Sequence, residues 1–240
     1  MSTEAFTKEN LDACLKELGK EYRKRSGTAM PAEIILTGGA SILANYGFRD
    51  VTYDVDAVII ASSAMKEAIN RVSDKLGLPN GWLNMDFRRT NSYSDRLTEF
   101  SVYYKTFSNV LTVRTITGEY LIAMKLMSGR RYKNDLSDIA GILWEHEKTG
   151  QPILREAVDK AVTVLYGGWR AVPPVSKELI QAAFDSGDYE KLYLSSRESE
   201  QQSKEILLEF ERDYPGELKG ENIDAIIEKA KRKRDDRDAR

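Results

Sequence analysis

Two glycines directly after an apolar run are residues whose types and spacing could do chemistry. Gly38 and Gly39 follow Leu36 and Thr37, and the hydroxyl of Ser41 comes two residues later. Glycines let the backbone approach a polyanion closely, and a helix that begins at such a turn directs its free N–H groups at the ligand. The segment therefore predicts a phosphate-binding turn.

Asp54 and Asp56 supply a second chemical group a short distance further along the chain. They are spaced two residues apart in a predicted strand, so their carboxylates project to one face and can share a divalent cation. Val55 and the apolar run 57–60 indicate a mostly buried strand, in which two unpaired negative charges would be unfavourable. A bound Mg²⁺ or Mn²⁺ would remove that conflict. With the glycine turn, the pair predicts a site for a metal-bound nucleoside triphosphate (NTP).

Each segment also has a simpler interpretation. An Asp-x-Asp pair alone is more often a solvated strand end, and Gly38-Gly39 alone can be a tight turn. The glycine segment has no Lys-Ser or Lys-Thr pair, which excludes a P-loop, and it lacks the full Gly-x-Gly-x-x-Gly dinucleotide fingerprint. The combination of the two segments favours the triphosphate site over these alternatives.

Short predicted elements must hold the two segments in place. Residues 34–37 and 54–61 are rich in apolar and β-branched types and are predicted as strands, with a short helix at 41–46 between them. This order places the glycines at a strand-to-helix turn. Helical spacing of apolar residues predicts further helices at 7–25 and 63–77, and the stretches 99–107 and 110–116 resemble a hairpin.

The pattern becomes almost entirely helical after residue 117. The predicted helices span 118–129, 134–148, 151–166, 176–184, 188–212 and 221–236. The sequence therefore predicts a small α/β core with its N-terminal helix at 1–117 and a helical region at 118–240 that packs on it. About the last ten residues mix both signs of charge and are predicted to fray.

The composition excludes several classes of protein. A single cysteine, Cys14, cannot form an internal disulfide or a multi-cysteine zinc site and is expected in the core. A single histidine, His146, excludes histidine-rich metal centres and is expected in a surface or helix-dipole role near a helix end. Acid–base chemistry must therefore use carboxylates or lysine. The 36 basic and 38 acidic residues give a net charge of −2, so no strong global field attracts nucleic acid.

Hydropathy bears on the location of the protein. The chain has no signal-like apolar segment at its start, and no apolar run approaches the roughly 20 residues needed to cross a bilayer. We therefore expect a cytoplasmic protein without a membrane contact.

Two separated blocks of sequence resemble the nucleotidyltransferase superfamily typified by DNA polymerase β. Within it, the chain is most similar to small bacterial proteins allied to the AbiEii and MenT toxins and to uncharacterised nucleotidyltransferase-fold proteins. The likeness spans roughly residues 34 to 143, and its blocks are 38–43, 47–49, 52–56, 119–126, Arg130 and 133–139. The resemblance implies an α/β (α+β) nucleotidyltransferase fold, in which a short mixed sheet is flanked by helices and followed by a helical C-terminal half.

The resemblance also assigns roles to eight residues by position. Gly38, Gly39 and Ser41 would bind triphosphate oxygens, Arg49 and Lys125 would meet phosphate charge, Asp54 and Asp56 would hold Mg²⁺, and Asp138 would lie near the active site. Enzymes of the superfamily generally carry a third carboxylate that activates the acceptor hydroxyl. The weak candidates for it are Asp86 and Glu99, with Asp138 as a substitute.

The function implied is Mg²⁺-dependent transfer of a nucleoside monophosphate from an NTP to an acceptor hydroxyl on tRNA or a protein. A toxin with a partner antitoxin is one biological role that the resemblance offers. Two alternatives stay open: a catalytically weak nucleotide-binding or interaction module, and a small-molecule nucleotidyltransferase of the aminoglycoside-modifying type. The sequence does not select among the NTPs or the acceptors.

Overall fold

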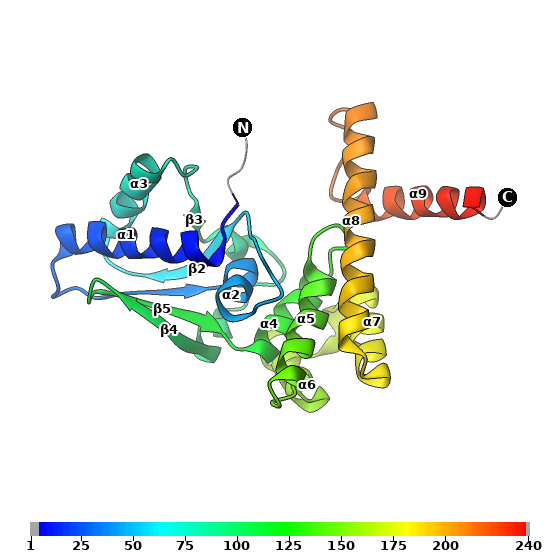
Figure 1. Cartoon of the computed structure of the whole chain (residues 1–240), viewed down its shortest axis with the longest axis horizontal. Coiled ribbons are helices and arrows are strands. Elements are labelled where there is room, and N and C mark those ends of the chain that lie inside the picture. The colour runs from blue at the N-terminus through cyan, green and yellow to red at the C-terminus, as the bar shows by residue number, and fades with distance from the viewer. Residues whose placement is uncertain (1–4, 239–240) are drawn as a thin grey trace.

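The computed structural model describes residues 5–238, with side chains as far as residue 232. Residues 239 and 240, at the end of the stretch that is predicted to fray, lie outside the described part. Within the described residues, one mixed sheet has the strand order β3-β2-β1-β5-β4 (Figure 1). Its strands are β1 (Ala32–Leu36), β2 (Val55–Ile60), β3 (Leu83–Asn84), β4 (Ser101–Phe107) and β5 (Leu111–Ile116). Helices flank this sheet, which confirms the predicted α+β fold class.

Strand pairing decides which segments meet at the edge of the sheet. β1 and β2 are antiparallel, and Leu36 near the end of β1 pairs with Ala57 near the start of β2. The residues after β1 and before β2 therefore lie at the same edge. β3 runs parallel to β2 and pairs Asn84 with Asp56, so the chain beyond β3 emerges near that edge as well.

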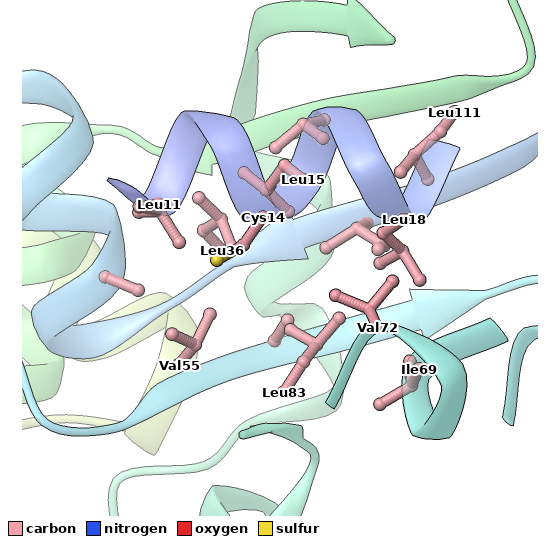
Figure 2. Close-up of a cluster of buried hydrophobic side chains, with 14 of the residues drawn as sticks. Leu11, Cys14, Leu15, Leu18, Leu36, Val55, Ile69, Val72, Leu83 and Leu111 are labelled. Carbon is pink, nitrogen blue, oxygen red and sulfur yellow. The ribbon is translucent and has the colours of Figure 1, made fainter. Parts of the chain in front are cut away.

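Helices α1 (Lys8–Ser26) and α3 (Ala64–Leu76) share a hydrophobic core with the sheet (Figure 2). The helical spacing of Leu11, Leu15 and Leu18 brings all three side chains into this core, where each is at most 1% exposed. Cys14 is buried in the same cluster, as predicted. Burial of each such leucine contributes roughly 2 kcal/mol.

A second core joins the sheet to the helical half of the chain. Ile35 and Ile116 pack there with residues of five helices, whereas Ile34 and Leu36 belong to the first core, as the alternation of side chains along a strand requires. These helices are α2 (Gly38–Asn45), α4 (Gly118–Ser128), α5 (Asp135–Lys148), α6 (Arg155–Tyr166) and α7 (Pro174–Ser186).

The long helix α8 (Tyr189–Asp213) packs along α5, and α9 (Ile223–Asp238) projects from it (Figure 1). Glu200 of α8 lies at the N-terminus of α5, where its carboxyl accepts hydrogen bonds from the Leu136 N–H at 2.7 Å and the Ser137 hydroxyl at 2.5 Å. The first N–H groups of a helix have no partner within the helix. Glu200 therefore caps α5 from a distant part of the chain.

The structure differs from the sequence prediction in two places that matter for the site. Helix α2 begins at Gly38, not at residue 41, so the two glycines form its first turn. The stretch 83–100 contains β3 and two 3-10 turns, η1 (Asp86–Arg89) and η2 (Asp95–Phe100), which have no periodic signal. The predicted hairpin is confirmed, and Ser108 and Asn109 at its turn both have a φ of 54°.

Among the described helices, none combines the length and the apolarity that a bilayer crossing requires.

The cap at Glu200 generates a prediction about stability. Burial raises the pKa of Glu200 to about 8 from its usual 4.5, although its hydrogen bonds oppose the shift. Between these values the folded protein holds a proton that the unfolded chain releases, so the free energy of unfolding should fall as the pH rises from about 5 to 8. We expect Glu200→Gln to remove up to about 1.4 kcal/mol per pH unit of that slope.

Denaturant unfolding at several pH values measures this effect. Glu198→Gln is the control, because Glu198 is an exposed residue of the same helix. Equal slopes in wild type and Glu200→Gln would contradict the prediction.

Candidate functional site

A polar cavity of about 370 Å³ lies at the edge of the sheet where β1 ends and β2 begins. Its lining comes from four parts of the chain: Thr37, Gly38 and Gly39; Arg49, Thr52, Asp54 and Asp56; Asn84, Asp86, Phe87, Thr90 and Ser92; and Met124, Lys125, Ser128, Arg130, Lys133, Asn134 and Asp135. Six of the eight residues that the sequence singled out line this cavity, and Ser41 and Asp138 do not.

The antiparallel pairing of β1 and β2 explains why the glycines and the aspartates meet. The Thr37 N–H and hydroxyl both donate to the Asp56 carbonyl oxygen, at 2.9 and 3.1 Å. This double contact ties the turn before Gly38 to the strand that carries the carboxylates. The tie is made by backbone and hydroxyl groups, so both carboxylates stay available to the cavity.

Two local constraints explain the glycines themselves. Gly38 has a φ of +50°, a region that residues with a side chain rarely adopt. A Cβ on Gly39 would lie 2.6 Å from the Thr52 hydroxyl oxygen and 3.0 Å from Nη2 of Arg49. The start of α2 is therefore a bare backbone surface that faces an arginine, which suits a phosphate group.

Ser41 has a different place from the one that the sequence suggested. Its side chain is fully buried, and its hydroxyl accepts a hydrogen bond from the Ile116 N–H at 3.0 Å. This contact joins α2 to the end of β5. The hydroxyl is therefore a structural link in the packed interior rather than part of the cavity wall.

Besides Asp135, three carboxylates line the cavity, and they lie in or directly beside the neighbouring strands β2 and β3. Asp56 is partly buried, whereas Asp54 and Asp86 are exposed. Burial raises the pKa of the Asp56 carboxyl, and the negative charges of Asp54 and Asp86 raise it further. The register that pairs Asn84 with Asp56 places Asp86 here, because it comes two residues after Asn84. Of the two candidates for a third carboxylate, Asp86 therefore lines the cavity and Glu99 does not.

Glu99, the other candidate for a third carboxylate, lies outside the cavity lining. It is exposed in η2 and pairs with Arg96 at 3.2 Å. Glu99 therefore forms an ion pair within η2 on the surface of the molecule.

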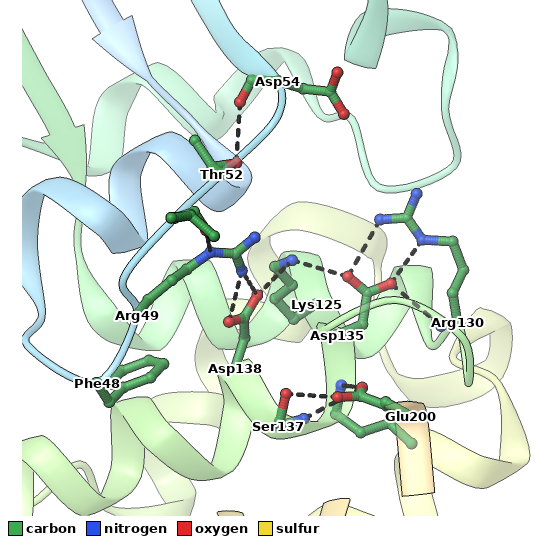
Figure 3. A network of polar contacts seen from close by, with 12 residues as sticks. Phe48, Arg49, Thr52, Asp54, Lys125, Arg130, Asp135, Ser137, Asp138 and Glu200 are labelled. Carbon is green, nitrogen blue, oxygen red and sulfur yellow. Dashed lines mark hydrogen bonds and ion pairs between the residues drawn. The ribbon is translucent and has the colours of Figure 1, made fainter. Parts of the chain in front are cut away.

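Buried and partly buried charges form an alternating chain beside the cavity (Figure 3). Nη1 of Arg49 donates to both carboxylate oxygens of Asp138, at 2.7 and 2.5 Å. Nζ of Lys125 lies 2.8 Å from Asp138 and 2.8 Å from Asp135. Arg130 completes the chain through its Nε, 2.7 Å from Asp135.

The chain of charges keeps Lys125 protonated. Burial alone would lower the pKa of Lys125, but the carboxylates of Asp135 and Asp138 outweigh it and raise that pKa. Burial alone would likewise raise the pKa of Asp135, but Lys125 and Arg130 hold it well below its usual range. Three cations and two carboxylates leave one net positive charge next to the three carboxylates of the cavity.

The donor set fits a divalent metal that is shared with a substrate. Asp54 and Asp56 offer hard oxygen ligands, and burial together with the charges of Asp54 and Asp86 raises the pKa of Asp56, which a bound cation would offset. Among the described residues, no group of three or more His, Cys, Asp or Glu side chains is arranged to hold a metal by itself. Mg²⁺ usually takes one or two carboxylates and completes its shell with waters and substrate phosphates.

His146 lies away from this cavity. Its Nδ1 is 3.1 Å from the Gln151 carbonyl oxygen and its Nε2 is 3.1 Å from the Tyr46 hydroxyl. Because a carbonyl can only accept, Nδ1 carries the proton of the neutral ring and Nε2 accepts from Tyr46. The histidine joins the end of α2 to the last turn of α5.

Sequence reasoning missed several residues of the cavity wall. Asn84 ends the two-residue strand β3, and Phe87, Thr90 and Ser92 belong to the irregular stretch after it, where no motif or period marks them. Arg130 was visible as part of the second block of resemblance, but its contact with Asp135 was not.

The buried charges generate a prediction about folding. Asp138 is 2% exposed, and Asp138→Asn would leave Arg49 and Lys125 with an uncompensated positive charge. Breaking one partner of a buried pair costs about 3 kcal/mol or more, so we expect that loss in the free energy of unfolding. Asp185→Asn, an exposed carboxyl of α7, is the control for denaturant unfolding. A loss under about 1 kcal/mol would mean that the contacts contribute little.

Comparison with known proteins was made for the whole chain. Residues 13–166 match the model of a family described as nucleotidyltransferase of unknown function (DUF6036). The chain matched none of the curated proteins and none of the solved structures with which it was compared. The family match covers well over half of the 240 residues and includes every residue that lines the cavity. The chain therefore belongs to the DUF6036 family of nucleotidyltransferases.

Proposed function

We propose that the protein transfers a nucleoside monophosphate from an NTP to an acceptor hydroxyl in a Mg²⁺-dependent reaction. The observation that carries this proposal is the meeting of a bare helix start, two neighbouring carboxylates and several cations in one cavity. A triphosphate needs charge compensation along its length, and a metal bound to two carboxylates needs further oxygen ligands. The cavity supplies the charges that compensate the triphosphate, and the substrate phosphates supply the further oxygen ligands of the metal.

The residues of the cavity divide this work. The first turn of α2, at Gly38 and Gly39, binds phosphate oxygens through the backbone. Nη2 of Arg49 faces the same turn, while its Nη1 is held by Asp138. Arg130 and Lys133 add positive charge at another part of the wall. Asp54 and Asp56 would hold Mg²⁺, which would supply charge for lowering the pKa of the attacking hydroxyl and for stabilising the leaving pyrophosphate.

Asp86 is the best-placed group to take the proton of the acceptor hydroxyl. It lines the cavity, it is exposed, and its charge acts on Asp56. Asp138, the substitute suggested by the resemblance, has both oxygens engaged with Arg49 and one of them with Lys125. A carboxylate that already accepts bonds from two cations is a poor base, so Asp138 acts by positioning Arg49 and Lys125.

The acceptor and the biological role belong to the proposal as well. The likeness to AbiEii and MenT toxins favours a hydroxyl of tRNA or of a protein side chain, and a toxin role with an antitoxin as partner. Because the net charge is −2, an RNA acceptor would have to dock through local basic groups rather than a global field. An aminoglycoside-type small acceptor would need an acidic pocket beside the triphosphate.

A second candidate function has its own supporting observation. Nζ of Lys125, the cation that the resemblance assigns to phosphate, lies 2.8 Å from a carboxylate oxygen of Asp135 and 2.8 Å from one of Asp138. A phosphate-binding cation that is already paired in this way suits a module that binds Mg-NTP without efficient transfer.

Incubation with each α-³²P NTP, Mg²⁺ and bacterial RNA, followed by separation of RNA, protein and small products, distinguishes these functions. We expect wild type to produce a labelled acceptor, and Asp54→Asn and Asp56→Asn to lose both transfer and metal-dependent NTP binding. Asp50→Asn is the control, because Asp50 is an exposed residue of the same connection that does not line the cavity. Transfer retained by Asp54→Asn would sink the assignment, and binding without any labelled product would favour the module.

Asp86 and Glu99 are the two candidates for the third carboxylate, and parallel substitutions at the two positions distinguish them. Asp86→Asn should reduce transfer by about 10²- to 10⁴-fold while Mg-NTP binding persists, because a general base contributes about that much. Glu99→Gln should retain transfer, since its carboxyl pairs with Arg96 on the surface. Rate measurements at saturating NTP test both variants, and equal rates for Asp86→Asn and wild type would remove Asp86 from this role.

A further inference from the structure

The cavity wall contains neutral side chains as well as charged ones, and we refer to these neutral residues as the neutral wall. Phe87 and Met124 contribute an aromatic ring and a thioether, and the hydroxyls of Thr90 and Ser92 lie near Phe87 along the chain. The triphosphate and the metal require the charged groups, so the neutral wall is where a nucleobase fits. Flat apolar contact together with a few polar groups is what base recognition generally uses.

A count of protons shows what Ser92 can offer to a base. The Thr90 hydroxyl donates to the Phe87 carbonyl oxygen at 2.7 Å, which uses its one proton. The oxygens of Thr90 and Ser92 lie 2.9 Å apart, and because Thr90 has no second proton, Ser92 must be the donor of that bond. The hydroxyl of Ser92 thus has no proton left, and Oγ presents lone pairs alone.

The segment that carries Ser92 is held rigidly. The Tyr166 hydroxyl of α6 donates to the Ser92 carbonyl oxygen at 2.6 Å, and burial raises the pKa of Tyr166, so the donor stays protonated. Phe87 packs edge-on against Tyr93 with 5.5 Å between ring centroids. Ser92 is 8% exposed, which leaves its side chain little room to turn. An acceptor in a fixed position can discriminate, because a mismatched group cannot be accommodated by rotation.

We propose that Ser92 Oγ selects nucleotides whose base carries an amino group at position 4 of a pyrimidine or position 6 of a purine, as in cytosine and adenine. The amino group donates to the lone pairs of Ser92, whereas the keto oxygen of uracil or hypoxanthine at the same place meets another acceptor. This inference rests on the proposed function, because it assumes that the cavity binds an NTP. It extends that function by naming the class of base and the residue that reads it.

Two matched ligand pairs isolate the amino group. CTP and UTP differ in the group at position 4, and ATP and ITP differ in the group at position 6. Titration calorimetry with Mg²⁺ should show that wild type binds CTP and ATP about tenfold more tightly than UTP and ITP, respectively, the worth of one hydrogen bond.

Two variants should remove this preference in opposite ways. Ser92→Ala deletes the acceptor, so CTP and ATP should weaken while UTP and ITP do not. Thr90→Val keeps Ser92 but frees its proton, so the hydroxyl can rotate and donate to a keto oxygen, and binding of UTP and ITP should improve. Thr106→Val on the exposed edge strand β4 is the matched control and should leave all four affinities unchanged.

The outcomes separate this inference from the proposed function. Equal affinities within both ligand pairs for wild type would overturn the role of Ser92 and leave the proposed function standing. A uniform loss of all four NTPs in Thr90→Val and Ser92→Ala would show that the two hydroxyls support the fold rather than the selection. Failure of wild type to bind any NTP would overturn the proposed function and, with it, this inference.

Discussion

The contact between Arg49 and Asp138 is the interaction on which the arrangement of the molecule depends. Arg49 lies in the connection between β1 and β2 on the sheet side, and Asp138 lies in the first turn of α5 on the helical side. Both carboxylate oxygens are used, and both side chains are largely buried. Two ions taken out of water at this depth are tolerated when geometry and further hydrogen bonds compensate them. Lys125 supplies that further bond and extends the contact to α4.

This arrangement explains how a site built from distant segments is held in one shape. The first turn of α5 carries Asp135 and Asp138, and Glu200 of α8 caps the same turn. The position of Lys125 and Arg49 therefore depends on a helix that begins more than 60 residues further along the chain than the charges it supports. The C-terminal part of the helical region thus helps to shape the cavity, although no residue after Asp135 lines it.

Electrostatic balance gives the cavity its chemical character. The wall carries two sets of charged groups: the carboxylates Asp54, Asp56 and Asp86, and the cations Arg49, Lys125 and Arg130. Lys125 is matched by carboxylates, so its charge is positioned rather than free. A site of this kind suits a ligand that brings a metal and phosphates together, because the metal then meets the carboxylates and the phosphates meet the cations. The neutral wall at Phe87, Thr90 and Ser92 is left for the uncharged part of the ligand.

The sequence by itself determined the elements whose signal is local. Helical spacing identified α1 with its buried Leu11, β-branched runs identified β1 and β2, and a two-residue break identified the β4–β5 hairpin. The sequence also predicted that Gly38, Gly39, Asp54 and Asp56 form one site, and the antiparallel pairing of β1 with β2 brings them to the same edge of the sheet. The functional roles of these residues stay predictions. Only the tertiary structure decided which carboxylate joins Asp54 and Asp56, what surrounds Lys125, and that Ser41 bonds to β5. The reason is physical: these outcomes depend on the two-residue pairing of β3 with β2 and on hydrogen bonds between segments far apart, which leave no periodic trace in the sequence.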